Sequence, residues 1–123
     1  MTVELVGGRV NGWLFFSSLE EDDTDFDTSA RLGLQVRRSR LEDARALLGP
    51  TDGEVRLPTN LLHDQFGSMQ EVMPPEGATQ AVVYKHVVGE RKDAIFTRRL
   101  KLLVLFAAPD DTITAIRWFD GTL

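Results

Sequence analysis

The two histidines are the residues of this sequence best suited to acid–base chemistry. His63 is followed by Asp64, whose carboxylate could orient the imidazole as a general base. His86 follows Tyr84 by two residues, so the two would share a strand face. A serine nucleophile of the hydrolase type would need a Gly-x-Ser-x-Gly turn, and the sequence contains none. We therefore assign no catalytic residue, and treat His63, His86 and Tyr84 as a candidate ligand-binding group.

Metal and cofactor chemistry finds little support in the sequence. Cysteine is absent, which excludes thiolate ligands, and the two histidines lack the His-x-x-x-His spacing of a zinc site. A calcium-binding EF-hand loop that began at Asp23 would require glycine at position 28 and glutamate at position 34, where the chain has Thr28 and Leu34. No glycine-rich phosphate loop is present. We expect neither a metal nor a cofactor.

The negative charge of the chain is concentrated in one segment. The sequence has 14 basic and 19 acidic residues, a net charge of −5, and six of the acids lie in residues 20–27 with no base among them. The segment is typical of a solvated loop, and its field could attract a basic partner. Its candidate protein-binding residues are Asp22, Asp23, Asp25 and Asp27.

Aromatic side chains on predicted strands are the other candidate contact residues. Trp13 and Phe15 alternate and should share one face, whereas the neighbours Trp118 and Phe119 should point to opposite faces. Burial in a two-layer core is one interpretation. The other is exposure of some of these rings on a sheet face, where they would anchor a protein partner.

Basic residues fall into two groups, around the predicted helix start and in the predicted central hairpin. They could contact phosphates, an acidic protein or lipid headgroups, or form ordinary solvated edges. The acidic balance of the whole chain argues against nucleic acid as a partner. The two groups are Arg37, Arg38, Arg40 and Arg45, and then Arg91, Lys92, Arg98, Arg99 and Lys101.

The elements that position these residues indicate one α+β domain over residues 1–123. The length suits a single core, and 42% of the residues are hydrophobic. Gly7-Gly8 between Val3–Val6 and residues 9–16 predicts a hairpin. Leu41, Ala44, Leu47 and Leu48 predict a helix over 40–48, with a Ser39/Glu42 capping box and a Gly49-Pro50 stop. Shorter elements are predicted at 31–36 (extended), 54–57 (strand) and 60–66 (helical turn).

The C-terminal third predicts a three-stranded antiparallel meander over residues 80–88, 95–106 and 112–119. A polar turn is expected at 89–93, and Leu100, Leu102, Val104 and Phe106 should share one face. Together with the N-terminal hairpin this gives an antiparallel sheet with one or two short helices packed on one face.

The order of helix and strands resembles a known family. The helix ending Leu47-Leu48-Gly49-Pro50 precedes strands with Val82-Val83-Tyr84, with residues 102–106 and with residues 113–118. This resembles the bacterial SmpA/OmlA (BamE-like) lipoprotein-domain family, and is similar to the fold of β-lactamase inhibitory proteins. The likeness covers about residues 39–119 and departs from the family in lacking a lipidated cysteine. It implies an α+β fold and, for a domain with its anchor removed, a role in envelope assembly in the periplasm.

The function that the sequence favours is a small non-catalytic protein-binding module that acts through a sheet face and an acidic loop. The alternatives are a small-ligand-binding protein or enzyme with a cavity near His63 and His86, and the envelope-assembly lipoprotein domain. No segment is long enough to span a membrane. The sequence as written suggests the cytoplasm, or the periplasm if a signal was trimmed, and an exposed edge strand could pair two copies into a homodimer.

Overall fold

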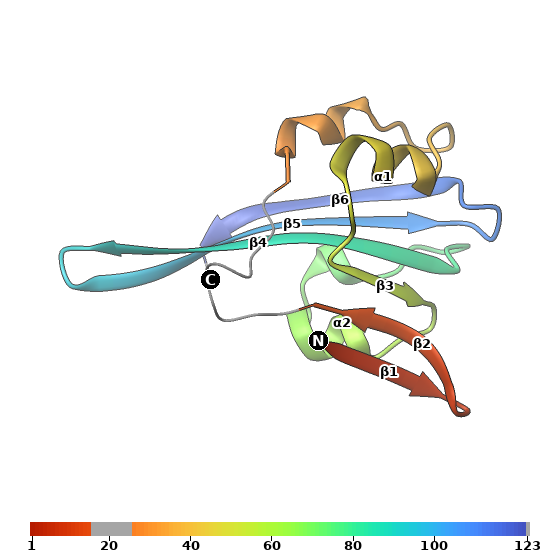
Figure 1. Ribbon diagram of the computed structural model, residues 1–123, viewed down its shortest axis with the longest axis horizontal. Helices are drawn as coiled ribbons and strands as arrows, with labels where there is room; N and C mark the ends of the chain where they lie inside the picture. The colour runs from red at the N-terminus through yellow and green to blue at the C-terminus, as the bar shows by residue number, and fades with distance from the viewer. Residues whose placement is uncertain (16–25, 123) are drawn as a thin grey trace.

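The chain is built around one antiparallel sheet, in which six strands lie side by side in the order of the sequence (Figure 1). The computed structural model describes residues 1–15 and 26–122. The strands are β1 (Thr2–Val6), β2 (Arg9–Leu14), β3 (Gly53–Arg56), β4 (Gln80–Lys92), β5 (Ile95–Ala107) and β6 (Ile113–Thr122). The helical segments are η2 (Thr28–Gly33), α1 (Leu41–Leu48), α2 (Leu61–Phe66) and η3 (Gln70–Val72). The α+β class, the N-terminal hairpin and the C-terminal meander are confirmed.

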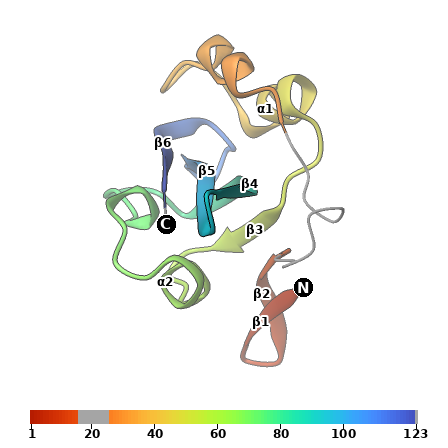
Figure 2. The ribbon, with the colours of Figure 1, turned by 90° about the vertical axis from the view of Figure 1, so that its left-hand side faces the viewer.

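Helices cover both faces of this sheet, where the sequence predicted one covered face (Figure 2). On one face, α2 and η3 pack Leu61, Leu62 and Val72 against the strands; we call this the first core. On the other face, the second core joins α1 to Tyr84 and Leu103. The physical reason lies in β5, whose central residues Leu102–Phe106 are buried on both sides, so that a helix on one face alone would leave half of them in water.

The first hairpin turns at Gly7 and Gly8 as predicted. Both residues have positive φ, 58° and 77°, the conformation of the tight hairpin turns that match the twist of the strands. Val6 pairs with Arg9 across this turn. A bulge follows on β2, because Glu4 pairs with Gly12 while Leu5 pairs with Val10.

Helix α1 is confirmed, but its cap lies one residue later than predicted. The Asp43 carboxylate accepts a hydrogen bond of 2.8 Å from the Arg40 N–H, the bond expected from a residue one turn into the helix. Ser39, the predicted cap, instead accepts the Gln35 N–H through its hydroxyl at 2.8 Å. The Ser39 hydroxyl therefore closes the turn that precedes α1 and does not cap the helix.

Two further segments differ from the sequence-based prediction. Residues 89–92, predicted as a polar turn, continue β4, and the turn consists of Asp93 and Ala94 alone, with φ of 51° and 68°. The prediction used apolar alternation as its signal for a strand, and residues 89–92 carry none. Residues 31–33, predicted as extended, belong to η2, which Asp27 caps by accepting the Ser29 N–H at 3.1 Å.

Candidate functional site

Tyr84, the first of the predicted ligand-binding residues, lies in the second core. Its side chain is 1% exposed, and its hydroxyl donates a 2.9 Å hydrogen bond to the Gly49 carbonyl just after α1. Burial raises the pKa of the phenol to about 12, so it stays protonated across the physiological range. Tyr84 therefore ties α1 to the sheet instead of facing a ligand.

The two histidines lie on opposite faces of the molecule. His86 shares a face of β4 with Tyr84 and is half-buried, and its Nδ1 has no hydrogen-bond partner among the described residues. His63 is exposed on α2, which packs on the other face. The structure therefore does not bring His63 together with His86 and Tyr84, and the two hollows described below are lined by none of the three.

The predicted contact residues near the C-terminus are packed within the fold. Trp118 is half-buried beside the second core, with Phe26 edge-to-face at 6.0 Å and the Arg31 guanidinium 4.4 Å from the centre of its ring. Phe119 packs against the first core on the opposite face. The expectation that the two rings point apart is met, and they do not form one surface.

Of the predicted acidic contact residues, only Asp27 lies within the described part of the chain. Hydrogen bonds from the hydroxyl and N–H of Ser29 hold the pKa of its carboxyl below the ordinary value. The role of Asp27 in the structure is therefore to cap η2. Asp22, Asp23 and Asp25 lie outside the described residues. Within the described ranges, no three His, Asp or Glu side chains are grouped so as to hold a metal ion.

Trp13 stands on a part of the sheet that no described helix covers. The described residues of the second core come from β4, β5, β6 and the helical segments, and from none of the first three strands. Across these strands a row of directly paired residues runs from Val3 to Trp13, then to Glu54 and Val82. Trp13 is half-buried in this row. Phe15 follows β2, half-buried, and its N–H donates to the Asp52 carbonyl at 2.7 Å.

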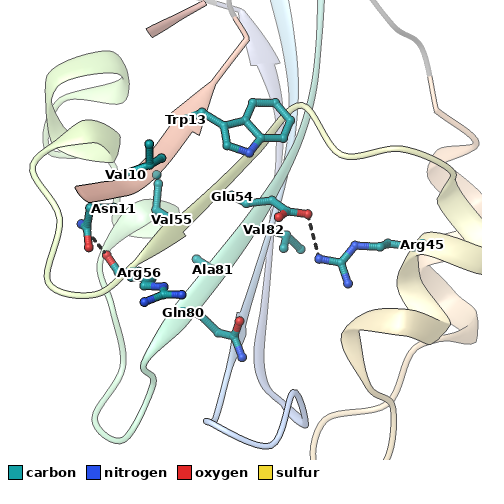
Figure 3. A pocket seen from close by; sticks show the side chains of 11 residues that line it. Val10, Asn11, Trp13, Arg45, Glu54, Val55, Arg56, Gln80, Ala81 and Val82 are labelled. Atoms are coloured by element: carbon teal, nitrogen blue, oxygen red, sulfur yellow. Dashed lines mark hydrogen bonds and ion pairs between the residues drawn. The ribbon is translucent and has the colours of Figure 1, made fainter. Parts of the chain in front are cut away.

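A hollow of about 250 Å³ opens between this row and α1 (Figure 3). Arg45 reaches from α1 to Glu54 on β3, with Nη2 2.7 Å from Oε1. That ion pair lies along one side of the hollow, and Trp13 stands next to Glu54 on the neighbouring strand. A second hollow, of about 360 Å³, lies around Arg56 and Gln80, where β3 ends and β4 begins. Both are open, mixed polar and apolar surfaces.

The outer border of the uncovered face is the edge strand β1, which is unusually apolar for an exposed edge. Val3 and Leu5 are 49% and 63% exposed, and Val10 opposite Leu5 is 60% exposed. Directly paired residues point to the same face, so these three side chains extend the row that contains Trp13. We call Val3, Leu5, Val10 and Trp13 the apolar stripe.

The backbone of β1 offers free hydrogen-bonding groups at this border. In a hairpin closed by a two-residue turn, the flanking residues, here Val6 and Arg9, bond to each other. Backbone hydrogen bonding alternates along the strand, so the backbone groups of Glu4 also point toward β2. The N–H and C=O groups of Val3 and Leu5 point outward, away from β2. Edge strands are commonly protected by lysine or proline, and Thr2–Val6 contains neither.

The one charge on β1 is used internally. The Glu4 carboxylate accepts hydrogen bonds from Asn11 (2.6 Å), the Thr59 hydroxyl (2.7 Å) and the Asn60 N–H (3.0 Å). Partial burial on its own would raise the pKa of Glu4, but these hydrogen bonds outweigh it and hold the pKa below the ordinary value. The carboxylate therefore anchors the hairpin to the start of α2 and leaves the edge unprotected.

Replacing Glu4 by glutamine should loosen this anchor in a pH-dependent way. Because the folded pKa is lowered, the carboxylate contributes stability that is complete above the ordinary pKa of about 4.3 and is lost as the pH falls through the folded value. At pH 7 we expect Glu4→Gln to cost about 1 kcal/mol in urea unfolding. The difference from the parent should shrink toward zero at low pH. Glu76→Gln, in an exposed loop, is the matched control and should have no effect at either pH.

The sequence analysis found Trp13 but missed Val3, Leu5 and Val10. The signal was present, since apolar residues alternate along Thr2–Val6 beside a Gly-Gly turn. What the sequence lacked was the position of α1, which does not extend over this end of the sheet. Comparison with protein-family models, with curated proteins and with solved structures gave no match. The site is therefore interpreted from its own geometry.

Proposed function

We propose that this chain is a non-catalytic protein-binding module that takes up an extended segment of a partner protein as an additional strand beside β1. The observation that carries the proposal is the unprotected, apolar edge of β1. Outward backbone groups at Val3 and Leu5 would bond the added strand, as in other complexes formed by strand addition. The proposed partner segment is extended and has alternating apolar side chains.

The apolar stripe explains why the segment should alternate. Side chains of an added strand that point toward the α1 side would lie beside Val3 and Leu5, and would continue the row that already runs through Trp13. Each buried aliphatic side chain contributes about 1.5–3 kcal/mol when it leaves water. In this proposal the backbone supplies the register and the stripe supplies the preference for apolar residues. The acidic segment 20–27 stays a prediction as a second contact for a basic partner.

The alternative function, a ligand site shared by the two histidines, gains no support from the geometry. His63 and His86 are on opposite faces of the sheet, and Tyr84 is committed to Gly49. The sheet-face part of the protein-binding hypothesis, in contrast, corresponds to a surface that the described chain leaves open. That surface lies at β1 and β2 and not at Trp118 and Phe119.

A display library of random eight-residue peptides tests the proposal with a defined probe. Selected peptides should show alternating apolar residues, and their Kd is measured by fluorescence anisotropy. Leu5→Pro removes an outward N–H that the sheet itself does not use, so it should weaken binding at least tenfold without lowering the melting temperature. Leu5→Ala keeps the N–H and is the matched control; it should weaken binding less than proline does.

Hydrogen exchange gives an independent readout for the same peptides. The amides of Val3 and Leu5 should exchange rapidly in the free protein and become protected in the complex, whereas the Glu4 and Val6 amides should be slow in both. Selected peptides that bind Leu5→Pro as well as the parent would contradict the proposal. So would a mass in sedimentation equilibrium that doubles with concentration and is halved by Leu5→Pro, since a second copy would then occupy this edge.

A further inference from the structure

The hairpin of β4 and β5 extends well beyond the rest of the fold (Figure 1). The last pairing between β5 and β6 joins Arg99 to Thr122, while β4 and β5 continue to pair as far as Lys92 and Ile95. We call residues 89–98, which pair only with each other, the arm. It is a two-stranded ribbon closed by Asp93 and Ala94, and it lies at the far side of the molecule from α1 and from β1.

The end of the arm is apolar on both of its faces. Ile95 and Phe96 are 66% and 60% exposed, and successive residues of a strand point to opposite sides. Two large apolar side chains at a solvated tip are costly to expose, which indicates a contact that covers them. A flat protein surface would cover one side of the ribbon. A fluid apolar medium covers both.

An arginine follows behind the tip on each face, and the one on the Ile95 face is paired with an acid. Arg98 shares a face with Phe96, and its guanidinium lies 5.8 Å from the centre of the Phe96 ring. Arg99 shares a face with Ile95, and its Nε donates to Asp120 at 2.7 Å. With a rise of about 3.4 Å per residue, the arginines stand about 7 Å and 14 Å behind their apolar neighbours.

The charge of the arm is opposite to that of the remaining chain. Residues 89–98 hold three bases and two acids, whereas all other residues together hold 11 bases and 17 acids. An anionic surface would therefore attract the arm and repel the body, so that the arm meets the surface end-on. The bases of the arm are Arg91, Lys92 and Arg98.

We propose that the arm is a membrane-surface contact, which inserts Ile95 and Phe96 into the headgroup region of a bilayer that contains anionic lipids. Apolar groups of peripheral proteins enter about 5–10 Å into this region, and that depth places Arg98, about 7 Å behind Phe96, at the level of the lipid phosphates. Attraction of basic residues to the anionic leaflet and burial of the two apolar side chains both favour this contact. In the described ranges no helix is long and apolar enough to cross a membrane.

Co-sedimentation with vesicles tests this contact with the full chain. Vesicles of phosphatidylcholine with about one-third phosphatidylserine should bind the protein at least tenfold more strongly than phosphatidylcholine alone, and added salt should weaken the binding. Phe96→Asp should reduce it at least tenfold, and Arg98→Glu should reduce it and its salt dependence. Leu32→Asp, at an equally exposed position in η2, is the matched control and should bind like the parent.

The absence of cysteine allows a second, site-specific measurement. An environment-sensitive dye on Ile95→Cys should shift to the blue with anionic vesicles, and the same dye on Leu32→Cys should not. Free phosphoserine should not reproduce the shift, because it offers the phosphate without the bilayer. Failure of the parent to bind, or a shift of equal size at both positions, would overturn the proposal. Equal binding to soluble polyglutamate and to vesicles, insensitive to Phe96→Asp, would also overturn it and indicate an acidic protein instead.

Discussion

Replacing Phe106 by alanine should lower the free energy of unfolding by about 3–5 kcal/mol. Phe106 is fully buried near the C-terminal end of β5, and its direct neighbours on both sides are alanines, Ala81 on β4 and Ala115 on β6. The single ring therefore fills space that neither neighbouring side chain can reach, and its removal leaves a cavity in the first core. A domain of this size has a total stability of about 5–15 kcal/mol, so the loss is a large fraction of it.

The same substitution farther along the same strand provides a close control. Phe96 also lies on β5 but is exposed at the arm, and Phe96→Ala should change stability by no more than about 0.5 kcal/mol. Urea unfolding followed by circular dichroism measures both variants, and the melting temperature of Phe106→Ala should fall by about 10–20 °C. Comparable losses at the two positions would show that the arm is packed in solution.

Replacing Gly12 by alanine should cost about 3 kcal/mol and should also disable the proposed binding edge. A Cβ atom at Gly12 would lie 2.6 Å from Val55 Cγ1 and 2.8 Å from both Val55 Cα and the Glu54 carbonyl oxygen. Two of these atoms are backbone, so the conflict cannot be relieved by turning a side chain. The strands β2 and β3 must separate, and β2 is the strand that carries β1.

A neighbouring pair shows that this close approach is systematic. Gly53 on β3 lies opposite Leu14 on β2, as Gly12 lies opposite Val55, so each glycine gives space to a large buried residue across the strand pair. The matched control is Gly33→Ala, where a Cβ would meet only the end of the exposed Leu47 side chain at 3.3 Å. We expect it to change stability by less than about 1 kcal/mol. Gly12→Ala should also lose the selected peptides, and wild-type stability of this variant would disprove the packing argument.

The sequence alone determined the elements whose signals are local. The Gly7-Gly8 turn, the helix that ends at Leu48 and the alternation of residues 100–106 are all in the structure at the expected places. These features depend on backbone conformations and on burial patterns that a few neighbouring residues specify. The same local information placed Gly12 in a strand. It could not show that a Cβ atom at this position would lie 2.6 Å from Val55 Cγ1.

The tertiary structure alone decided which surfaces stay open. The sequence left open whether Tyr84, Trp118 and Phe119 are exposed for binding. In the structure, Tyr84 packs against α1, Trp118 lies beside η2, and Phe119 packs against the first core. The position of α1 over β4 to β6 leaves Val3, Leu5 and Trp13 without a covering helix among the described residues, and that position follows from contacts between residues distant in the chain. The arm is similar: residues 89–93 were predicted as a polar turn, whereas residues 89–92 continue β4 because the predicted strand β5 pairs with them as far as Ile95.

The two histidines illustrate the physical limit most clearly. Spacing along the chain says which residues share a strand face, and it placed His86 correctly beside Tyr84 on β4. It carries no information on which side of the sheet a distant helix will pack, since that depends on the summed burial of both faces. His63 travels with α2 to the first core, while His86 faces the second. The residue types suggested a shared site for the two histidines, but the sheet lies between them and keeps them apart.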